Sequence, residues 1–408
     1  MTGRAIVVGG GIGGLAAAVA LRRIGWQAVV LERAAELGEI GAGMSQAPNA
    51  LRALAELGVG EQARAAGVPT YSAGNLRLPD GRYLQRARPG DATPLTAFHR
   101  ADLHRVLLEA VPAGWVRTGA EVTGIQHDSG AVTVTWSGGE AGADLVIGAD
   151  GIRSTVRRLL WPDAPPPRFL GRTAWLGIAE AGTGAFADAD GLSGSVTMGP
   201  GGYFLIHPIS RDRAYWAYVT TADQAGVRYP GEKSEAARRL SGWHAPIPAL
   251  IAATPGQAVI HIDICDLDPL PTYVRGRAVL LGDAAHAMSP DRGQGAGQSI
   301  EDAVVLAAAL ADEPADEGGG GSGGESGGES EVEAALRRYD AERRPRTQAT
   351  ARGARADGRR TTSAAAYRAL VAMIRLMPAP LWRKGITADA NPTWRWQPPH
   401  LPSPTRRH

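Results

Sequence analysis

The 408-residue chain contains a single cysteine, Cys265, which excludes an internal disulfide and is typical of a reducing compartment. Lysine occurs only at Lys233 and Lys384, so arginine supplies nearly all of the positive charge. The net charge is +2 and the basic residues are scattered, apart from short clusters such as 343–346. This composition does not favour binding to nucleic acid.

Long apolar runs are also missing. None approaches the roughly 20 residues that span a bilayer, and the first predicted strand begins at residue 4 or 5, which leaves no room for a signal peptide. We therefore expect a cytoplasmic protein with no membrane partner and no metal site. The length and an apolar fraction of 44% allow two or three domains with a substantial core.

The most informative stretch lies near the N-terminus, where the apolar residues 5–8 predict a buried parallel strand. Gly9, Gly11 and Gly14 follow with G-x-G-x-x-G spacing, and an alanine-rich helix is predicted over 15–23. These glycines allow a tight turn, a close approach to a pyrophosphate and packing of the helix on the sheet, respectively. The free N–H groups and the positive dipole at the start of the helix favour such an anion.

In a chain with 54 glycines this spacing alone is a weak signal, but its surroundings make it specific. A second apolar strand, 28–31, follows the helix and ends in Glu32, where an acidic residue is expected to bind ribose hydroxyls. The stretch therefore predicts a site for an adenine dinucleotide.

Two later stretches, within 143–158 and 277–297, also predict a strand that ends in a turn and is followed by a helix. Three such strand ends in one chain are far more specific than one. The turn residues are Asp150, Gly151, Arg153 and Ser154 in the first stretch, and Gly282, Asp283, Pro290, Gly293 and Gly295 in the second.

The remaining pattern predicts an inserted domain and a helical C-terminus. Strands are predicted at 173–180, 193–199, 203–209, 214–221 and 258–264, and helices at 50–57, 99–110, 298–310, 332–344 and 362–375. Residues 38–50 are too irregular for an element before the helix, and the acidic, Gly/Ser-rich residues 312–331 predict a flexible surface loop. The predicted division is 1–70, 100–170 and 275–345 for a discontinuous nucleotide-binding domain, 71–99 and 171–274 for a substrate-binding β-sheet domain, and 346–408 for a C-terminal helical segment and arm.

Taken together, the three motifs resemble the signatures of class A (single-component) FAD-dependent aromatic hydroxylases of the p-hydroxybenzoate and salicylate hydroxylase type, over about residues 4–350. The resemblance implies an α/β fold, with a Rossmann-like FAD-binding domain (GR2-type), an inserted antiparallel β-sheet substrate domain and C-terminal helices. No second G-x-G-x-x-G follows a strand, so NAD(P)H is expected to bind only transiently as a co-substrate.

The resemblance also implies roles for single residues. Asp283 is expected to accept a hydrogen bond from a ribityl hydroxyl, and the helix after Gly293 to face the flavin pyrimidine edge, where its dipole contributes about 1–2 kcal/mol. Arg153 is either functional or part of a plain salt bridge, and His286 either lines the flavin or is structural. The implied cofactor residues are Gly9, Gly11, Gly14, Glu32, Arg33, Arg100, Asp150, Asp283, Pro290, Gly293, Gly295 and Ala296.

The implied reaction is oxygen transfer from dioxygen, through a flavin hydroperoxide, to an aromatic or heteroaromatic substrate, with a polycyclic natural product favoured by the aromatic, weakly charged strands. On the strand 203–209, Tyr203, Leu205 and His207 share one face, and Phe204 and Ile206 the other. His207 is a candidate to accept a phenolic proton, or else packs without chemistry, and Tyr203 lines the pocket or belongs to the core.

Several alternatives stay open. The same flavin chemistry serves an epoxidase or another oxygenase on a non-aromatic substrate, and a redox-inert FAD-binding homologue would use the cavity for binding alone. A flavin-dependent halogenase is disfavoured, because Trp394-Arg-Trp-Gln-Pro lacks the isoleucine of W-x-W-x-I-P and a catalytic lysine is missing. Both a monomer and a homodimer are compatible with the sequence.

Overall fold

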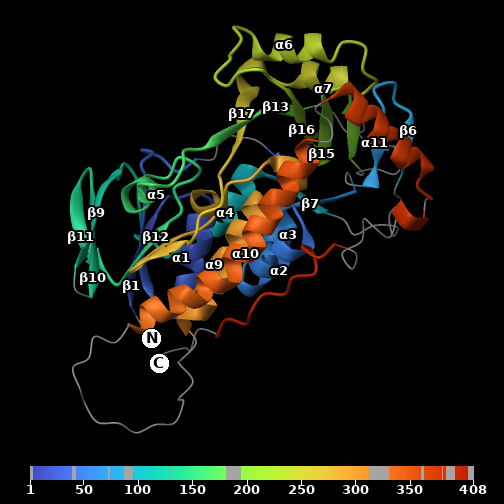
Figure 1. Ribbon diagram of the computed structural model, residues 1–408. Helices are drawn as coiled ribbons and strands as arrows, with labels where there is room; N and C mark the ends of the chain where they lie inside the picture. Colours follow the sequence, from blue (N-terminus) through green and yellow to red (C-terminus); the bar gives the residue numbers. More distant parts are fainter. Residues whose placement is uncertain are drawn as a thin grey trace.

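The computed structural model describes residues 3–38, 43–71, 74–86, 95–128, 130–180, 194–311, 330–359, 363–378, 380–382 and 391–402. Most of the predicted flexible loop, residues 312–329, lies outside this part, so that expectation stays a prediction. Figure 1 shows two halves, one built on a mostly parallel sheet and the other on a larger, mostly antiparallel sheet.

The first half is built on a sheet that has six strands among the described residues, and β18 alone runs antiparallel to its neighbour. The register sets Val8 opposite Leu31 and Gly148, and Gly148 opposite Leu280, so four neighbouring strands end at one edge of the sheet. The order is β18 (Val274–Arg275), β19 (Ala278–Leu280), β12 (Leu145–Gly148), β1 (Arg4–Val8), β2 (Gln27–Leu31) and β8 (Val116–Arg117).

Helices and a small sheet cover this parallel sheet. Helix α1 contacts β1 and β2 and lies between α4 and α9, while the small sheet contacts β1 and β12. Burial on both faces explains why β1 and β12 are almost wholly apolar. The elements are α1 (Ile12–Arg23), α4 (Arg100–Ala110), α9 (Gly295–Ala311), α5 (Thr155–Leu160), α8 (Asp283–His286), α2 (Pro48–Glu56), α3 (Gly60–Ala66), the 3₁₀ helix η3 (Pro290–Arg292), and β9 (Val122–Asp128), β10 (Ala131–Trp136) and β11 (Gly139–Ala143).

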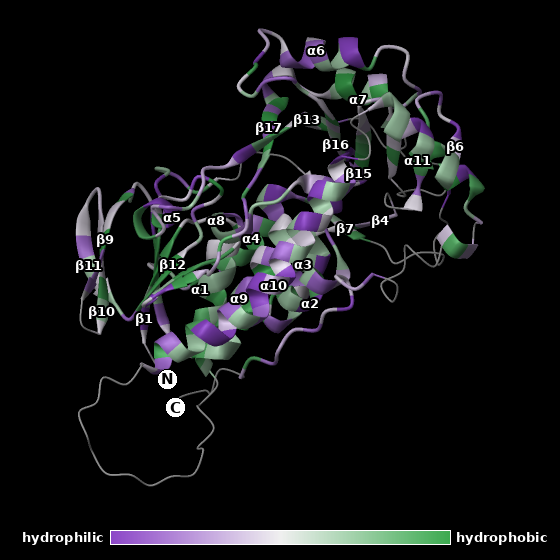
Figure 2. Cartoon of the chain, in the orientation of Figure 1, coloured by the Kyte–Doolittle hydropathy of each residue, from purple (hydrophilic) through white to green (hydrophobic). Residues whose placement is uncertain are grey.

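The second half is a sheet with seven strands in the described part of the chain. Trp175, Phe204 and Trp216 are buried on its outer face beneath α6 and α7, and Figure 2 shows that α6 is largely hydrophilic in sequence. The five strands predicted between 173 and 264 are all present. The order is β17 (Ile260–Asp266), β13 (Arg168–Glu180), β16 (Arg213–Thr221), β15 (Gly202–Pro208), β14 (Ser195–Gly199), β5 (Leu76–Arg77) and β6 (Tyr83–Gln85), with α6 (Glu232–Arg239), α7 (Ile247–Ala253) and the 3₁₀ helix η2 (Gly256–Ala258).

Two local predictions are wrong. The segment 38–50 contains a strand, β3 (Gly43–Gln46), which pairs with β7 (Leu95–His99). Strand β4 (Val68–Thr70) pairs with the other edge of β7. Sequence analysis missed β3 because its partner strand, β7, lies about 50 residues further along the chain. Its glycine is required by packing, since a Cβ on Gly43 would lie 2.2 Å from Cγ of Tyr215.

The helix predicted to end at Arg344 instead continues as α10 (Glu331–Arg359), with Pro345 inside it. Proline removes one helical hydrogen bond, but Thr347, Thr350 and Ala354 beyond it are buried, so tertiary packing maintains the helix. Helix α11 (Ala364–Leu376) follows close to its predicted position, and residues 391–402 form an arm without regular structure. No helix within the described ranges has the length and apolar character to cross a bilayer.

Candidate active site

A cavity of about 530 Å³ lies where the carboxyl-end edge of the parallel sheet meets the inner face of the antiparallel sheet. Its walls come from the turns after β1, β2, β12 and β19, from β3, from the start of α9, and from β13, β15, β16 and β17. All three sequence motifs therefore face the same space as the strand 203–209.

The glycine motif forms a narrow cradle at one end of the cavity. Gly9 has φ +109°, and a Cβ there would lie 2.5 Å from the carbonyl oxygen of Ala149. A Cβ on Gly14 would lie 1.9 Å from the Gly9 carbonyl oxygen, so only glycine fits at this position of α1, which begins at Ile12, before the predicted Leu15. Gly11 precedes α1 and lines the cavity, and no described side chain caps this helix end. Its N–H groups are thus available to a phosphate, as FAD requires.

The acidic residue after β2 is held rigidly beside this cradle. Glu32 lines the cavity and accepts hydrogen bonds from the backbone N–H groups of Gly10, at 2.7 Å, and Ala34, at 2.9 Å. Arg33 and Arg100 also line the cavity, and His104, a residue that sequence analysis missed, lies 2.8 Å from the Gly10 carbonyl oxygen through its Nε2. The geometry fits a ribose at this position.

The second motif caps helix α5 at the cavity wall. Asp150 Oδ2 accepts hydrogen bonds from the N–H groups of Thr155, at 2.6 Å, and Val156, at 3.1 Å. Its Oδ1 is buried and has no hydrogen-bond partner among the described residues, and burial raises the pKa of this carboxyl. Arg153 also lines the cavity.

The third motif gives two adjacent turns. Gly282 has φ +58°, and a Cβ there would lie 2.6 Å from Oγ of Ser299, so only glycine fits where the chain presents Asp283. Asp283 is exposed to the cavity, and a Cβ on Gly295 would lie 3.8 Å from its Oδ1. Pro290, Gly293, Gly295 and Ala296 complete this wall at the N-terminus of α9.

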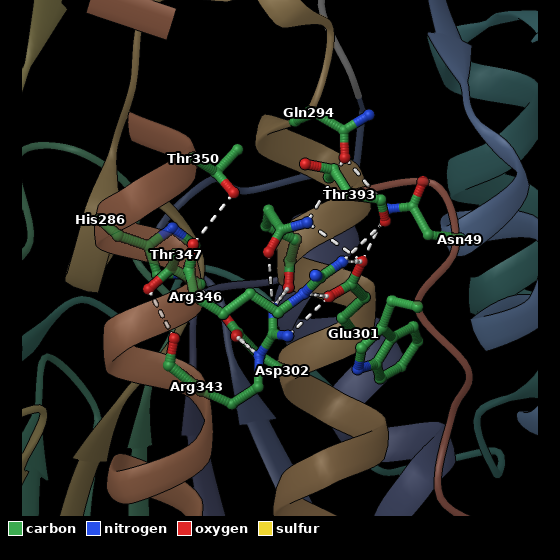
Figure 3. A network of polar contacts seen from close by, with 12 residues as sticks. Asn49, His286, Gln294, Glu301, Asp302, Arg343, Arg346, Thr347, Thr350 and Thr393 are labelled. Atoms are coloured by element: carbon green, nitrogen blue, oxygen red, sulfur yellow. Dashed lines mark hydrogen bonds and ion pairs between the residues drawn. The ribbon is translucent and has the colours of Figure 1, made fainter. Parts of the chain in front are cut away.

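A buried polar network that sequence analysis missed supports these two turns (Figure 3). Asp302 accepts a hydrogen bond from the Gly282 N–H at 2.9 Å and lies 2.6 Å from Nε2 of His286. Arg343 of α10 binds Asp302 at 2.7 Å and Glu301 at 2.6 Å, and all three side chains are fully buried. Burial opposes ionisation, but His286 and Arg343 lower the pKa of Asp302 to about 2. His286 is therefore structural and is not part of the cavity wall.

The same network reaches the cavity through amide side chains. Asn49 Nδ2 donates to Glu301 at 2.6 Å and to Oε1 of Gln294 at 3.0 Å, and Gln294 lines the cavity. Arg346 binds both carboxylate oxygens of Glu301, and Trp396 of the C-terminal arm lies over Arg346. The sequence signal for this network was the adjacent acid pair Glu301 and Asp302, which directly precedes the apolar second half of α9.

The antiparallel sheet provides the opposite wall. As predicted, Tyr203, Leu205 and His207 face the cavity, while Phe204 and Ile206 are buried on the other face. Burial lowers the pKa of His207 to about 4, so the imidazole is neutral near pH 7. The remaining cavity residues of this sheet are Ala174, Leu176, Tyr215, Ala217, Val219 and Ile262.

A buried ion pair lies behind Tyr203. Arg172 Nη1 and Asp291 Oδ2 are 2.7 Å apart, and both side chains are almost fully buried. The Arg172 guanidinium lies 5.8 Å from the centre of the Tyr203 ring. Burial and the Asp291 carboxylate raise the pKa of Tyr203, which keeps the phenol protonated. Sequence analysis identified neither member of this pair.

Comparisons with known proteins agree with this geometry. Residues 3–354 match the family described as "FAD binding domain". Aurachin C monooxygenase/isomerase of Stigmatella aurantiaca is 41% identical over 307 residues, which cover 74% of this chain and 79% of that protein. An FAD-dependent urate hydroxylase of Klebsiella pneumoniae is 32% identical over 348 residues, with coverage of 83% and 85%.

A solved structure of HpxO from the same species, in complex with FAD and uric acid, superposes with a TM-score of 0.82 and 30% identity, and covers 94% of this chain and 95% of that one. The glycine cradle, the Glu32 carboxylate beside it and the two turns before α9 are features that suit such a cofactor. The chain belongs to the FAD-binding domain family and is an FAD-dependent, NAD(P)H-using monooxygenase of the single-component aromatic hydroxylase class.

Proposed function

We propose that this monooxygenase hydroxylates an uncharged aromatic or heteroaromatic ring that binds against the inner face of the antiparallel sheet. The observation that carries this proposal is the character of that wall. In the described part of the chain, the sheet contributes six aliphatic side chains and the rings of Tyr203, His207 and Tyr215 to the cavity, and no charged side chain. An apolar wall with a few hydrogen-bonding groups suits a ring system larger than a small carboxylate.

The nucleotide-binding half is proposed to hold FAD in extended form along the cavity. The N-terminus of α1 would bind the pyrophosphate, Glu32 the ribose, and Asp283 a ribityl hydroxyl. Bound FAD supplies the redox chemistry by which electrons from NAD(P)H and one atom of dioxygen reach the substrate. The proposed cofactor residues remain Gly9, Gly11, Gly14, Glu32, Arg33, Arg100, Asp150, Asp283, Pro290, Gly293, Gly295 and Ala296.

On the substrate side, His207 is proposed to accept a hydrogen bond from a ring hydroxyl. Its pKa of about 4 makes it a weaker base than an exposed histidine, so it orients the hydroxyl and draws its proton away from the ring without removing it fully in the ground state. This raises the electron density of the ring that receives oxygen. Tyr203, protonated beside Asp291, forms the neighbouring part of the wall.

The test uses three ring compounds with the FAD-loaded enzyme: the uncharged bicyclic 4-hydroxyquinoline, the carboxylate 3-hydroxybenzoate, and urate. NAD(P)H oxidation is measured with and without each compound, and the product mass is determined under ¹⁸O₂. We expect the bicyclic compound to stimulate NAD(P)H oxidation most and to gain one ¹⁸O atom. Preference for either anionic compound, the carboxylate or urate, would refute the proposed substrate class.

A second candidate is oxygenation, by epoxidation or otherwise, that is followed by rearrangement of the substrate skeleton. The name of the 41% identical relative, a monooxygenase and isomerase, favours it. Both candidates add one oxygen atom, so mass alone does not separate them. A ¹³C NMR spectrum of the product distinguishes an unchanged ring that bears a new hydroxyl from a rearranged skeleton.

A further inference from the structure

Gln46, the last residue of β3, carries a buried amide side chain. Its side chain is 1% exposed and lines the cavity. Neither Oε1 nor Nε2 has a hydrogen-bond partner among the described residues. Because an unsatisfied buried amide is costly, a glutamine is expected at such a position when a ligand supplies the missing donor and acceptor.

The position of Gln46 indicates which part of a ligand it meets. A Cβ on Gly297, in the first turn of α9, would lie 3.2 Å from Gln46 Oε1, so the amide lies against the start of that helix. Asp283 flanks the same turn, since a Cβ on Gly295 would lie 3.8 Å from its Oδ1. Gln46 and Asp283 therefore both line the cavity beside the first turn of α9.

Asn49 also lies close to Gly297, because a Cβ there would lie 3.9 Å from Asn49 Nδ2. Asn49 uses its Nδ2 on Gln294 and Glu301, as Figure 3 shows, while its own Oδ1 is buried without a partner in the described part of the chain. Glu301 is in turn bound by Arg343 and Arg346. The side chains of Asn49 and Gln294, next to the start of α9, are therefore held by a buried network of charged groups.

We propose that Gln46 is a positioning residue that pairs with the imide edge of the flavin, accepting a hydrogen bond from the ring N–H and donating one to an adjacent carbonyl oxygen. This rests on the proposed FAD site. A primary amide is the natural complement of an imide, since each offers one donor beside one acceptor. The reduced flavin carries its negative charge on this ring, and the positive end of α9 favours that charge.

The experiment measures the FAD dissociation constant and the flavin midpoint potential of two variants. Gln46→Leu removes both hydrogen bonds, so we expect FAD affinity to fall about tenfold. Gln46→Glu places a carboxylate beside the reduced, anionic ring, so we expect a more negative midpoint potential than in Gln46→Leu. Gln27→Glu, an exposed position at the start of β2, is the matched charge control and should change neither quantity.

Unfolding temperature is recorded for each variant, and Gln46→Met, which keeps the length of the side chain, replaces Gln46→Leu if the latter fails to fold. The inference is overturned if the parent binds FAD and the Gln46 variants match it in affinity and potential, or if only the KM of the substrate changes. A parent that cannot bind FAD would instead refute the proposed function itself.

Discussion

Replacing Arg343 by methionine tests whether the buried network holds the two turns before α9. The guanidinium donates to Asp302, Glu301 and Gln298, and the side chain is fully buried on α10. Methionine fills most of the volume but leaves two buried carboxylates with fewer positive partners. Removing one partner of a buried ion pair typically costs about 3–5 kcal/mol.

The remaining contacts place the expected loss near the lower end of that range. Asp302 keeps the Gly282 N–H and His286, and Glu301 keeps Asn49 and Arg346. We therefore expect Arg343→Met to lower the free energy of unfolding by about 3 kcal/mol. FAD affinity should fall as well, because Asp302 holds the turn that presents Asp283.

The assay combines thermal unfolding of the apo and FAD-loaded forms with titration of FAD. The neighbouring Arg344→Met is the control, because Arg344 forms a part-exposed pair with Asp340 one helical turn away, and such pairs contribute only about 0.3–0.5 kcal/mol. The reasoning fails if Arg343→Met and Arg344→Met unfold at the same temperature and bind FAD equally well.

Three further predictions concern single residues. Gly14→Ala should abolish FAD binding, since its Cβ would meet the Gly9 carbonyl oxygen at 1.9 Å. Gly256→Ala should not, because Gly256 is exposed and a Cβ there has no neighbour within 4 Å; equal FAD titrations of the two variants would contradict this. Asp283→Ala should weaken FAD binding about tenfold through loss of one charge-assisted hydrogen bond, and an unchanged dissociation constant would exclude that contact. Folded His207 has a pKa of about 4 against about 6.5 unfolded, so below pH 6.5 the unfolded chain binds the extra proton. The free energy of unfolding should therefore fall by up to about 3 kcal/mol from pH 6.5 to 4. Chemical denaturation at a series of pH values measures it, and the His207→Phe variant should lack this part of the pH dependence.

Much of the cavity that is proposed to hold the cofactor was predictable because its signals are local. The spacing of Gly9, Gly11 and Gly14 reflects contacts within one strand-turn-helix unit, where a missing Cβ decides whether the turn can form. Period-two alternation likewise placed Tyr203 and His207 on one face of β15, since successive side chains of a strand point to opposite sides.

Other parts of the site depend on contacts between distant segments. The strand β3 exists because it pairs with β7, and α10 continues past Pro345 because its far side is buried. The Arg172–Asp291 pair joins residues 119 positions apart, and the sequence gives no spacing that would announce it.

The amino-acid sequence by itself determined the family, the cofactor and the three strand ends, because each is encoded in a short run of residues with a fixed spacing. Only the tertiary structure decided what surrounds them. In the described part of the chain, these surroundings are the buried ion pairs of Arg343 beside α9, the Gln46 amide without a hydrogen-bond partner, and a sheet wall without charged side chains. Burial and partner choice are properties of the folded chain, since they depend on which distant side chains exclude water from the same space.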